Sequence, residues 1–194
     1  MAGKSAVFEC IAKRIEEIIS GSIFPEDPVH SKDTLKWLLV MKPDADEALQ
    51  IAALGHDIER GYETDRVLKE NYELYNEYKA THALNSAKIL KEELEECGAD
   101  EKLTEDVYWL VSRHEWGGDE RADLLREADT ISFFHNNLSY YFRRHTHDES
   151  LSKCRWCFDR LSVEGKAIVR KFDYQDEKLF RMFRDELLKS KDKW

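Results

Sequence analysis

Apolar residues recur at helical spacing along most of the chain. In the first segment, Phe8, Ile11 and Ile15 lie three and four residues apart, which is the spacing of one face of an α-helix. No segment shows the alternation of apolar and polar residues that is typical of a strand. The pattern therefore predicts an all-α fold, and its further helical stripes lie in residues 30–41, 44–57, 64–96, 104–114, 120–137 and 153–189.

Prolines and capping residues define the expected helix boundaries. Pro25 and Pro28 predict a loop over residues 20–29, so that His30 is expected at the start of the next helix. Asp44, followed by Glu47, resembles the capping box of the helix that ends in His56 and Asp57. Residues 64–96 are expected to form one long or broken helix, and Thr104 is expected to cap the helix that reaches His114.

Length and charge limit the classes of partner. The 194 residues suit a single domain over residues 1–194, with 42% hydrophobic and 36% charged residues. A net charge of −10 argues against nucleic acid as the main partner, because binding phosphate backbones requires a basic surface. The negative net charge does not argue against a small anionic substrate, since a local site can be positive on an acidic protein. With no apolar run of membrane-spanning length and no signal-peptide core, we expect a cytoplasmic protein without a membrane partner.

The cysteines have a default interpretation and an alternative. In a chain of this type we expect free thiols rather than disulfides at Cys10, Cys97, Cys154 and Cys157. The last two form a C-x-x-C pair downstream of two histidines, and all four residues together have the chemistry of a zinc site: His145, His147, Cys154 and Cys157. The same spacing also arises when two buried thiols lie one turn apart on a helix, which the neighbouring Trp156 and Phe158 favour.

Histidines and aspartates recur on or beside the apolar helix faces. Taken singly, each has an ordinary explanation: a lone histidine is commonly a hydrogen-bonded core residue, and Asp129 could pair with Arg121 or Arg126. Burying several ionisable groups without a common partner is costly, however, and a metal ion removes that cost. Imidazole and carboxylate ligands suit Fe, Mn, Co, Ni or Zn. The candidate ligands are His30, His56, Asp57, His82, His114 and Asp129.

The order and setting of these residues resemble a known family. The arrangement H(30)…GHD(57)…H(82)…H(114)…AD(129) is similar to the HD-domain superfamily of metal-dependent phosphohydrolases, which is named for its His-Asp doublet. The segments "THALNSAKIL", "VYWLVSRHEWGG" and "READTISFF" also resemble helices of that family. The resemblance covers about residues 25–135. It implies an HD-domain-like helical bundle, with the N-terminal helix and the C-terminal helices as additions.

The resemblance also implies a metal centre and an activity. The ligands of a first metal ion would be His30, His56, Asp57 and Asp129. In members with two ions the doublet aspartate bridges them, and His82 and His114 would hold the second. In members with one ion, these two histidines would instead bind phosphate or protonate the leaving group. The implied reaction is hydrolysis of a small phosphorylated substrate, a nucleotide or another phosphomonoester, by metal-activated water.

Some roles and some functions stay open. Arg60 follows the doublet by three residues and would either contact substrate phosphate or lie on the surface, paired with Glu59 or Glu63. Glu59 itself is expected to be an exposed acid at a helix end. The segment "HDIERG" lacks the signature of the family branch that cleaves cyclic dinucleotides. A six-ligand HD site also occurs in di-iron oxygenases, and a non-catalytic regulatory module could retain metal ligands.

Overall fold

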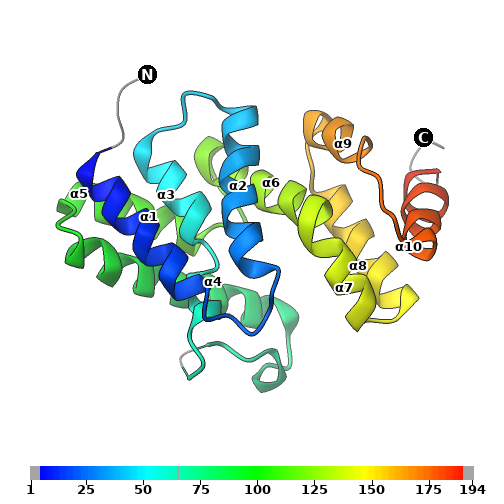
Figure 1. Ribbon diagram of the computed structural model, residues 1–194, viewed down its shortest axis with the longest axis horizontal. Coiled ribbons are helices and arrows are strands. Elements are labelled where there is room, and N and C mark those ends of the chain that lie inside the picture. The colour runs from blue at the N-terminus through cyan, green and yellow to red at the C-terminus, as the bar shows by residue number, and fades with distance from the viewer. Residues whose placement is uncertain (1–4, 65, 190–194) are drawn as a thin grey trace.

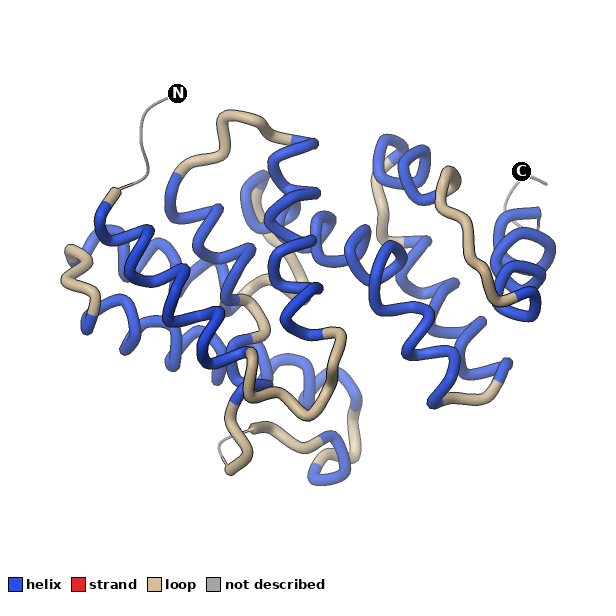
Figure 2. Tube along the Cα trace, viewed as in Figure 1, coloured by secondary structure: helices blue, strands red, loops and turns tan. Residues whose placement is uncertain are grey.

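Helices and their connections make up the described chain. The structure is a computed structural model, which describes residues 5–64 and 66–189. Figures 1 and 2 show a helical molecule, and these two ranges contain no strand, so the predicted all-α fold is confirmed. The α-helices are α1 (Ala6–Ile19), α2 (Asp27–Met41), α3 (Glu47–Gly55), α4 (Tyr75–Glu96), α5 (Glu101–Ser112), α6 (Glu120–Ser132), α7 (Leu138–Arg144), α8 (His147–Asp159), α9 (Val163–Val169) and α10 (Glu177–Arg181). Shorter helical segments are the 3-10 turns η1 (Ile58–Gly61) and η2 (Lys69–Asn71) and the π-helical segments η3 (Phe133–Asn137) and η4 (Met182–Leu188).

Aspartate caps begin two helices at positions other than those predicted. Asp46, and not Asp44, precedes α3, and its Oδ1 accepts the backbone N–H of Leu49 at 2.9 Å. Asp100, and not Thr104, caps α5 in the same way. Both aspartates have extended backbone and satisfy an N–H that the first helical turn leaves free.

Three other predicted boundaries are also wrong. Helix α2 begins before His30, because Pro28 lies in its first turn, where its missing N–H is not needed. Helix α4 begins only at Tyr75, and the polar residues before it form a connection that contains η2. His114 lies beyond the end of α5, in a turn that continues to Gly117, whose φ of +76° favours glycine.

Two hydrophobic clusters fill the interior, and one continuous run of helix contributes to both. The buried residues of the first cluster come from the chain between Phe8 and Ala128. Those of the second cluster come from the chain between Ile131 and Leu188. Helix α6 passes through η3 into α7 without a break, carrying Ala128 in the first cluster and Ile131 in the second. Figure 1 shows this run crossing from the left half of the molecule to the right half.

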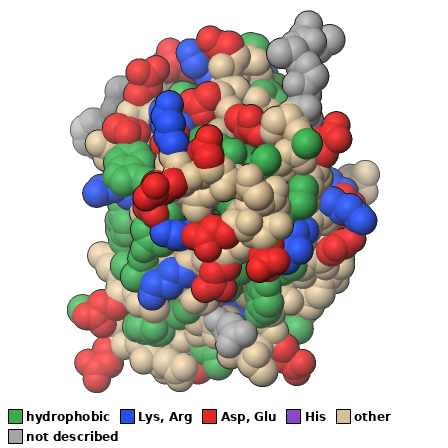
Figure 3. Space-filling view, turned by 90° about the vertical axis from the view of Figure 1, so that its left-hand side faces the viewer, with side chains coloured by type: hydrophobic (Ala, Val, Ile, Leu, Met, Phe, Trp, Pro, Cys, Tyr) green, Lys and Arg blue, Asp and Glu red, His purple; other side chains and the backbone are tan. Residues whose placement is uncertain are grey.

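The surface is acidic, and no long apolar helix is present. Figure 3 shows the end of the molecule that lies at the left of Figure 1, over which Asp and Glu side chains are widely spread. This distribution agrees with the net charge of −10. Within the described ranges, no helix has both the length and the apolar character needed to cross a bilayer.

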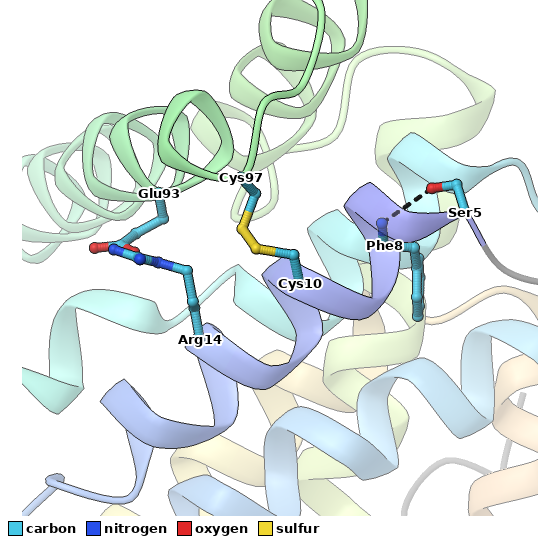
Figure 4. Close-up of a disulfide and its surroundings, with 6 residues drawn as sticks. All are labelled: Ser5, Phe8, Cys10, Arg14, Glu93 and Cys97. Carbon is cyan, nitrogen blue, oxygen red and sulfur yellow. Dashed lines mark hydrogen bonds and ion pairs between the residues drawn. A yellow bond between two sulfur atoms is a disulfide. The ribbon is translucent and has the colours of Figure 1, made fainter.

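A disulfide joins the first helix to the end of the fourth. Cys10 of α1 and Cys97, directly after α4, have Cα atoms 5.8 Å apart and bonded sulfurs (Figure 4). The expectation of free thiols is therefore wrong for this pair, because the packing of α1 on α4 joins residues 87 positions apart. It is confirmed for Cys154 and Cys157, which are buried and free. Since disulfides persist mainly in oxidising compartments, the cysteines no longer support the expected cytoplasmic location.

The alternative zinc site does not form. Both of its histidines are exposed and have other partners: His145 stacks on Tyr141, with 3.7 Å between the ring centroids, and His147 Nε2 lies 2.9 Å from a carboxylate oxygen of Glu186. Neither histidine joins Cys154 and Cys157 in any cluster of metal-ligating atoms among the described residues.

Loss of the disulfide is expected to destabilise the protein. A cross-link that closes a loop of this length restricts the unfolded chain and contributes about 4 to 5 kcal/mol. For a chain of this size, Cys10→Ser should therefore lower Tm by roughly 10 °C in a calorimetric scan. A reducing agent should lower the Tm of the native chain by a similar amount and leave the variant unchanged. An unchanged Tm in native protein whose thiols all titrate as free would contradict this prediction.

Candidate metal centre

The six candidate ligands lie together where five segments of the chain meet. His30 comes from α2, the doublet follows α3, His82 comes from α4, His114 follows α5, and Asp129 comes from α6. All are buried except Asp129, whose side chain is 24% exposed. Their ligating atoms form two groups, with all atoms of a group within 4.8 Å of one another: His30, His56 and Asp129, and Asp57, His82 and His114. That these residues bind metal stays a prediction.

The carboxylate of Asp57 lies between the two groups. Its Oδ2 is 3.9 Å from Nε2 of His30 and 3.7 Å from Nε2 of His56. Its Oδ1 is 2.8 Å from Nε2 of His82 and 3.9 Å from Nε2 of His114. Because each oxygen faces a different group, Asp57 is placed as a bridging carboxylate would be.

The doublet reaches this point because α3 is buried on all sides. Every residue from Ile51 to Gly55 is buried, so the helix runs through the core instead of along its surface. Gly55 lets α3 end in close contact with α4, since a Cβ there would lie 2.7 Å from a methyl group of Leu90, which would have to move. The chain then turns at Asp57, with φ −108° and ψ 20°, which separates its carboxylate from the imidazole of His56.

Backbone carbonyls orient two of the histidines. Nδ1 of His56 lies 3.1 Å from the carbonyl oxygen of Ala53, and Nδ1 of His114 lies 2.8 Å from that of Val111. Since a carbonyl can only accept, each Nδ1 carries the proton and donates it. When the imidazole is neutral, Nε2 therefore presents its lone pair to the centre. Hydrogen bonds of this kind fix the tautomer and the orientation of metal-binding histidines.

The nitrogen atoms at the centre fit a metal ion. Ser132 Oγ donates to the backbone oxygen of His30 and therefore accepts from Nδ1 of His30, at 2.8 Å. Nε2 of His30 then faces Nε2 of His56 at 3.3 Å, so that two lone pairs oppose each other unless a cation or a proton lies between them. Nε2 of His114 is buried and has no hydrogen-bond partner. A divalent transition metal would satisfy all three atoms.

Carboxylates control the electrostatics of the centre. Burial lowers the pKa of His56, but the charges of Asp57 and Asp129 outweigh it and raise that pKa to about 9. Burial acts against the charge of Asp57 as well, yet the neighbouring Arg60 and His56 hold its pKa well below the usual range. Burial acts against the charge of Asp129 too, but the neighbouring imidazoles of His30 and His56 hold its pKa well below the usual range. The centre therefore favours cations, and a metal ion would replace the imidazole protons.

Glu59 was expected to be exposed, which is wrong. The residue is 1% exposed, and its Oε1 accepts a hydrogen bond from Nδ1 of His82 at 2.6 Å. Its Oε2 also accepts from the amide of Asn85 at 2.7 Å. The tight turn of η1 directs this carboxylate inward, which helical periodicity could not indicate. Glu59 thus orients His82 as the carbonyls orient the other two histidines.

The arginines have partners other than those considered from the sequence. Arg60 Nη2 lies 3.0 Å from Oδ2 of Asp57, and Nη1 lies 3.2 Å from Oδ1 of Asp27. The proposed surface pairs with Glu59 or Glu63 are therefore wrong, and the guanidinium lies beside the centre. The arginines considered as partners for Asp129 bind elsewhere: Arg121 to Asp106 and Asp46, and Arg126 to Asp123 and the carbonyl of Trp116.

A buried ion pair adjoins the centre and was not predicted. Lys79 of α4 pairs with Glu115, and both side chains are buried. Glu115 Oε1 also lies 3.3 Å from Nε2 of His114. The only sequence signal was the position of Glu115 next to a candidate ligand, which does not reveal the lysine that neutralises it.

A cleft leads from solvent to the centre. Its volume is about 670 Å³, a size that suits a small ligand, and His30, Asp57 and Asp129 form part of its lining. Arg60 and Tyr78 also line it, and Tyr78 stacks on the ring of His82. His30, Asp57 and Asp129 thus face a pocket whose lining includes basic, acidic and aromatic side chains.

One comparison with known proteins gives a match. The family model described as "Domain of unknown function (DUF4202)" matches residues 13–179, a range that includes all six candidate ligands and the cleft. No curated protein and no solved structure matches the chain.

Replacing both histidines of the second group tests whether the centre holds two ions. If they are ligands, the variant His82→Ala/His114→Ala should lose one equivalent of metal and keep the other, because the first group is untouched. Metal analysis and calorimetric titration with Mn²⁺ would measure both values. The exposed pair His145→Ala/His147→Ala is the matched control and should bind as the native chain does. Equal stoichiometry in the native chain and the His82/His114 variant would exclude a second ion at these residues.

Proposed function

The chain belongs to the DUF4202 family, and we propose that this member is a metal-dependent phosphohydrolase that acts on a nucleotide or another small phosphomonoester. The observation that supports the proposal is the convergence of four imidazole Nε2 atoms and two carboxylates beside a cleft that His30, Asp57 and Asp129 help to line. The proposed relationship to HD-domain phosphohydrolases rests on the same six residues.

The centre would divide its ligands between two positions. His30, His56 and Asp129 would hold a first ion, and His82 and His114 a second, with Asp57 shared between them. A bound divalent ion supplies Lewis-acid and water-activating chemistry, which is what hydrolysis of a phosphate ester requires. The hydrogen bonds that each Nδ1 donates keep the rings oriented toward the centre while the cleft admits the substrate.

Cationic side chains beside the centre would bind the phosphoryl group. The guanidinium of Arg60 stays charged at all relevant pH values and offers paired N–H donors that match phosphate oxygens. Burial lowers the pKa of Lys79, but the charge of Glu115 outweighs it and raises that pKa, so Lys79 is also a cation in the wall of the cleft. In a centre with one ion, His82, whose Nε2 lies 2.8 Å from Oδ1 of Asp57, would be the residue to donate a proton to the leaving oxygen.

Replacement of Asp57 is the main test of this function. Asp57→Ala removes the carboxylate that both ligand groups share, so metal retention and phosphate release should both be abolished. The assay is phosphate release from a panel of phosphomonoesters with Mn²⁺, Co²⁺ or Ni²⁺ added. Asp44→Ala, at a side chain that is 79% exposed, is the control and should retain both properties.

Two results would refute the proposal. Full hydrolysis by Asp57→Ala would exclude the metal centre as its source. Oxygen consumption by the iron-loaded protein, without phosphate release from any substrate of the panel, would favour the oxygenase alternative.

Replacement of Arg60 separates substrate binding from metal binding. Removing a charged hydrogen bond to phosphate costs about 1.5 to 3 kcal/mol, so Arg60→Ala should lower kcat/KM roughly 10- to 100-fold, mainly through KM. Metal content should stay at the native value, because the arginine is not a ligand. Arg60→Lys, which keeps the charge but not the paired donors, should give an intermediate KM. Native kinetics in Arg60→Ala would remove this residue from the binding site.

A further inference from the structure

One face of α8 and its C-terminal cap forms a wall of the cleft. Lys153, Trp156 and Arg160 lie three and four residues apart, so their side chains project to the same side, and all three line the cleft. Lys153 Nζ is 4.6 Å and Arg160 Cζ is 3.9 Å from the ring centroid of Trp156. Two cations therefore flank one indole that is 37% exposed. We name Lys153, Trp156 and Arg160 the α8 basic face.

The cations of the α8 basic face differ from Arg60, Lys79 and Arg144 in the same cleft, because no ion pair with a carboxylate forms at them within the described part of the chain. Arg60, Lys79 and Arg144 each pair with a buried carboxylate. Among the described residues, by contrast, no carboxylate oxygen lies within 4.0 Å of the charged nitrogens of Lys153 or Arg160. The positive charge of the α8 basic face is therefore not neutralised by the protein.

The polar contacts of these two cations are with neutral acceptors. Lys153 Nζ donates to the hydroxyl of Tyr75 at 3.4 Å, and Arg160 donates to the backbone oxygen of Glu115. The nearest acid along α8 in the cleft is Glu149, whose Oε2 accepts from the backbone N–H and the hydroxyl of Thr146 in a capping box. Donor capacity and charge thus remain available to an anion in the cleft.

The α8 basic face lines the same cleft as three of the candidate metal ligands, His30, Asp57 and Asp129. Arg160 contacts Glu115, which is next to His114. Lys153 contacts Tyr75 at the beginning of α4, the helix that also carries His82. Lys153 and Arg160 are themselves separated by about 10 Å along the helix, at 1.5 Å per residue. A ligand held at the centre could therefore reach the α8 basic face from the same cleft.

We propose that the α8 basic face binds a second anionic group of the substrate. The inference rests on the proposed function, in which a phosphomonoester lies at the metal centre. A second phosphate or a carboxylate of the same molecule would lie against Lys153 and Arg160. On a chain of net charge −10, cations that the protein leaves unpaired create local attraction for an anion. The substrate class is thus a small molecule with two anionic groups.

Binding of matched probes to the Mn²⁺-loaded protein tests this inference without requiring turnover. The probes are propyl phosphate, 3-carboxypropyl phosphate, propane-1,3-diol bisphosphate and hexane-1,6-diol bisphosphate, titrated by calorimetry. At least one doubly anionic probe should bind about tenfold more tightly than propyl phosphate, which corresponds to one additional charged hydrogen bond. The carboxylate and phosphate probes distinguish which second group is preferred.

Variants of the α8 basic face identify the residues responsible. In Lys153→Met/Arg160→Met, the affinity for the doubly anionic probes should fall to within about twofold of the affinity for propyl phosphate, and the latter should be unchanged. We call the ratio of these two affinities the advantage of the doubly anionic probes. Lys153→Arg/Arg160→Lys keeps both charges and should keep most of the advantage. Arg155→Met removes an exposed charge of α8 that does not line the cleft. This variant should bind the doubly anionic probes more tightly than propyl phosphate by the same factor as the native protein.

Several results would overturn the inference. One such result is that the native protein binds all four probes with equal affinity. Another is that Lys153→Met/Arg160→Met loses affinity for every probe, propyl phosphate included, by the same factor. A loss of the advantage in Arg155→Met would indicate a general charge effect. If the probes are discriminated as expected but no phosphomonoester is hydrolysed, the phosphohydrolase function fails and the second anion site stands.

Discussion

The buried carboxylate of Asp57 is the group on which the rest of the structure depends. An isolated charge in the interior would be unfavourable by several kcal/mol, so the fold must supply cationic partners for it. Four imidazoles and the guanidinium of Arg60 surround it, and they come from α2, α3, η1, α4 and the turn after α5. The helices can pack in this way only if their ionisable residues meet. The packing of these helices and the arrangement of the candidate centre are therefore inseparable in the folded structure.

Pairing of charges also distinguishes the parts of the cleft. Near the centre, each cation is matched by a carboxylate, and each imidazole has its outer nitrogen held by an acceptor. Such groups are positioned before any ligand arrives, which reduces the reorganisation that binding would require. Elsewhere in the cleft, Lys153 and Arg160 contact the ring of Trp156, the hydroxyl of Tyr75 and the backbone oxygen of Glu115. The proposed function assigns the first region to the reaction, and the proposed second anion site assigns the other to recognition of charge.

The fold class could be predicted from the sequence, and so could the proximity of the six candidate ligands, for different reasons. Helical periodicity is a local property, so the stripe from Phe8 to Ile19 indicated α1 correctly without any knowledge of its neighbours. His30 and Asp129 were found together because a family pattern relates positions that periodicity cannot connect. Glu59 and the bond between Cys10 and Cys97 could not be found, because the first depends on the direction of a tight turn and the second on the packing of two helices.

The unbroken run from α6 through η3 to α7 makes the C-terminal half of the chain a support for the candidate centre. Asp129 and Ser132 stand on this run where the two hydrophobic clusters meet, and both contact His30. The position of the run is set on one side by Phe134, whose ring packs against Phe183 in the second cluster. The same run therefore has one face in the packing of the C-terminal helices and presents Asp129 and Ser132 to His30. The C-terminal helices contribute no candidate ligand, yet they pack against the helical run that carries two partners of His30.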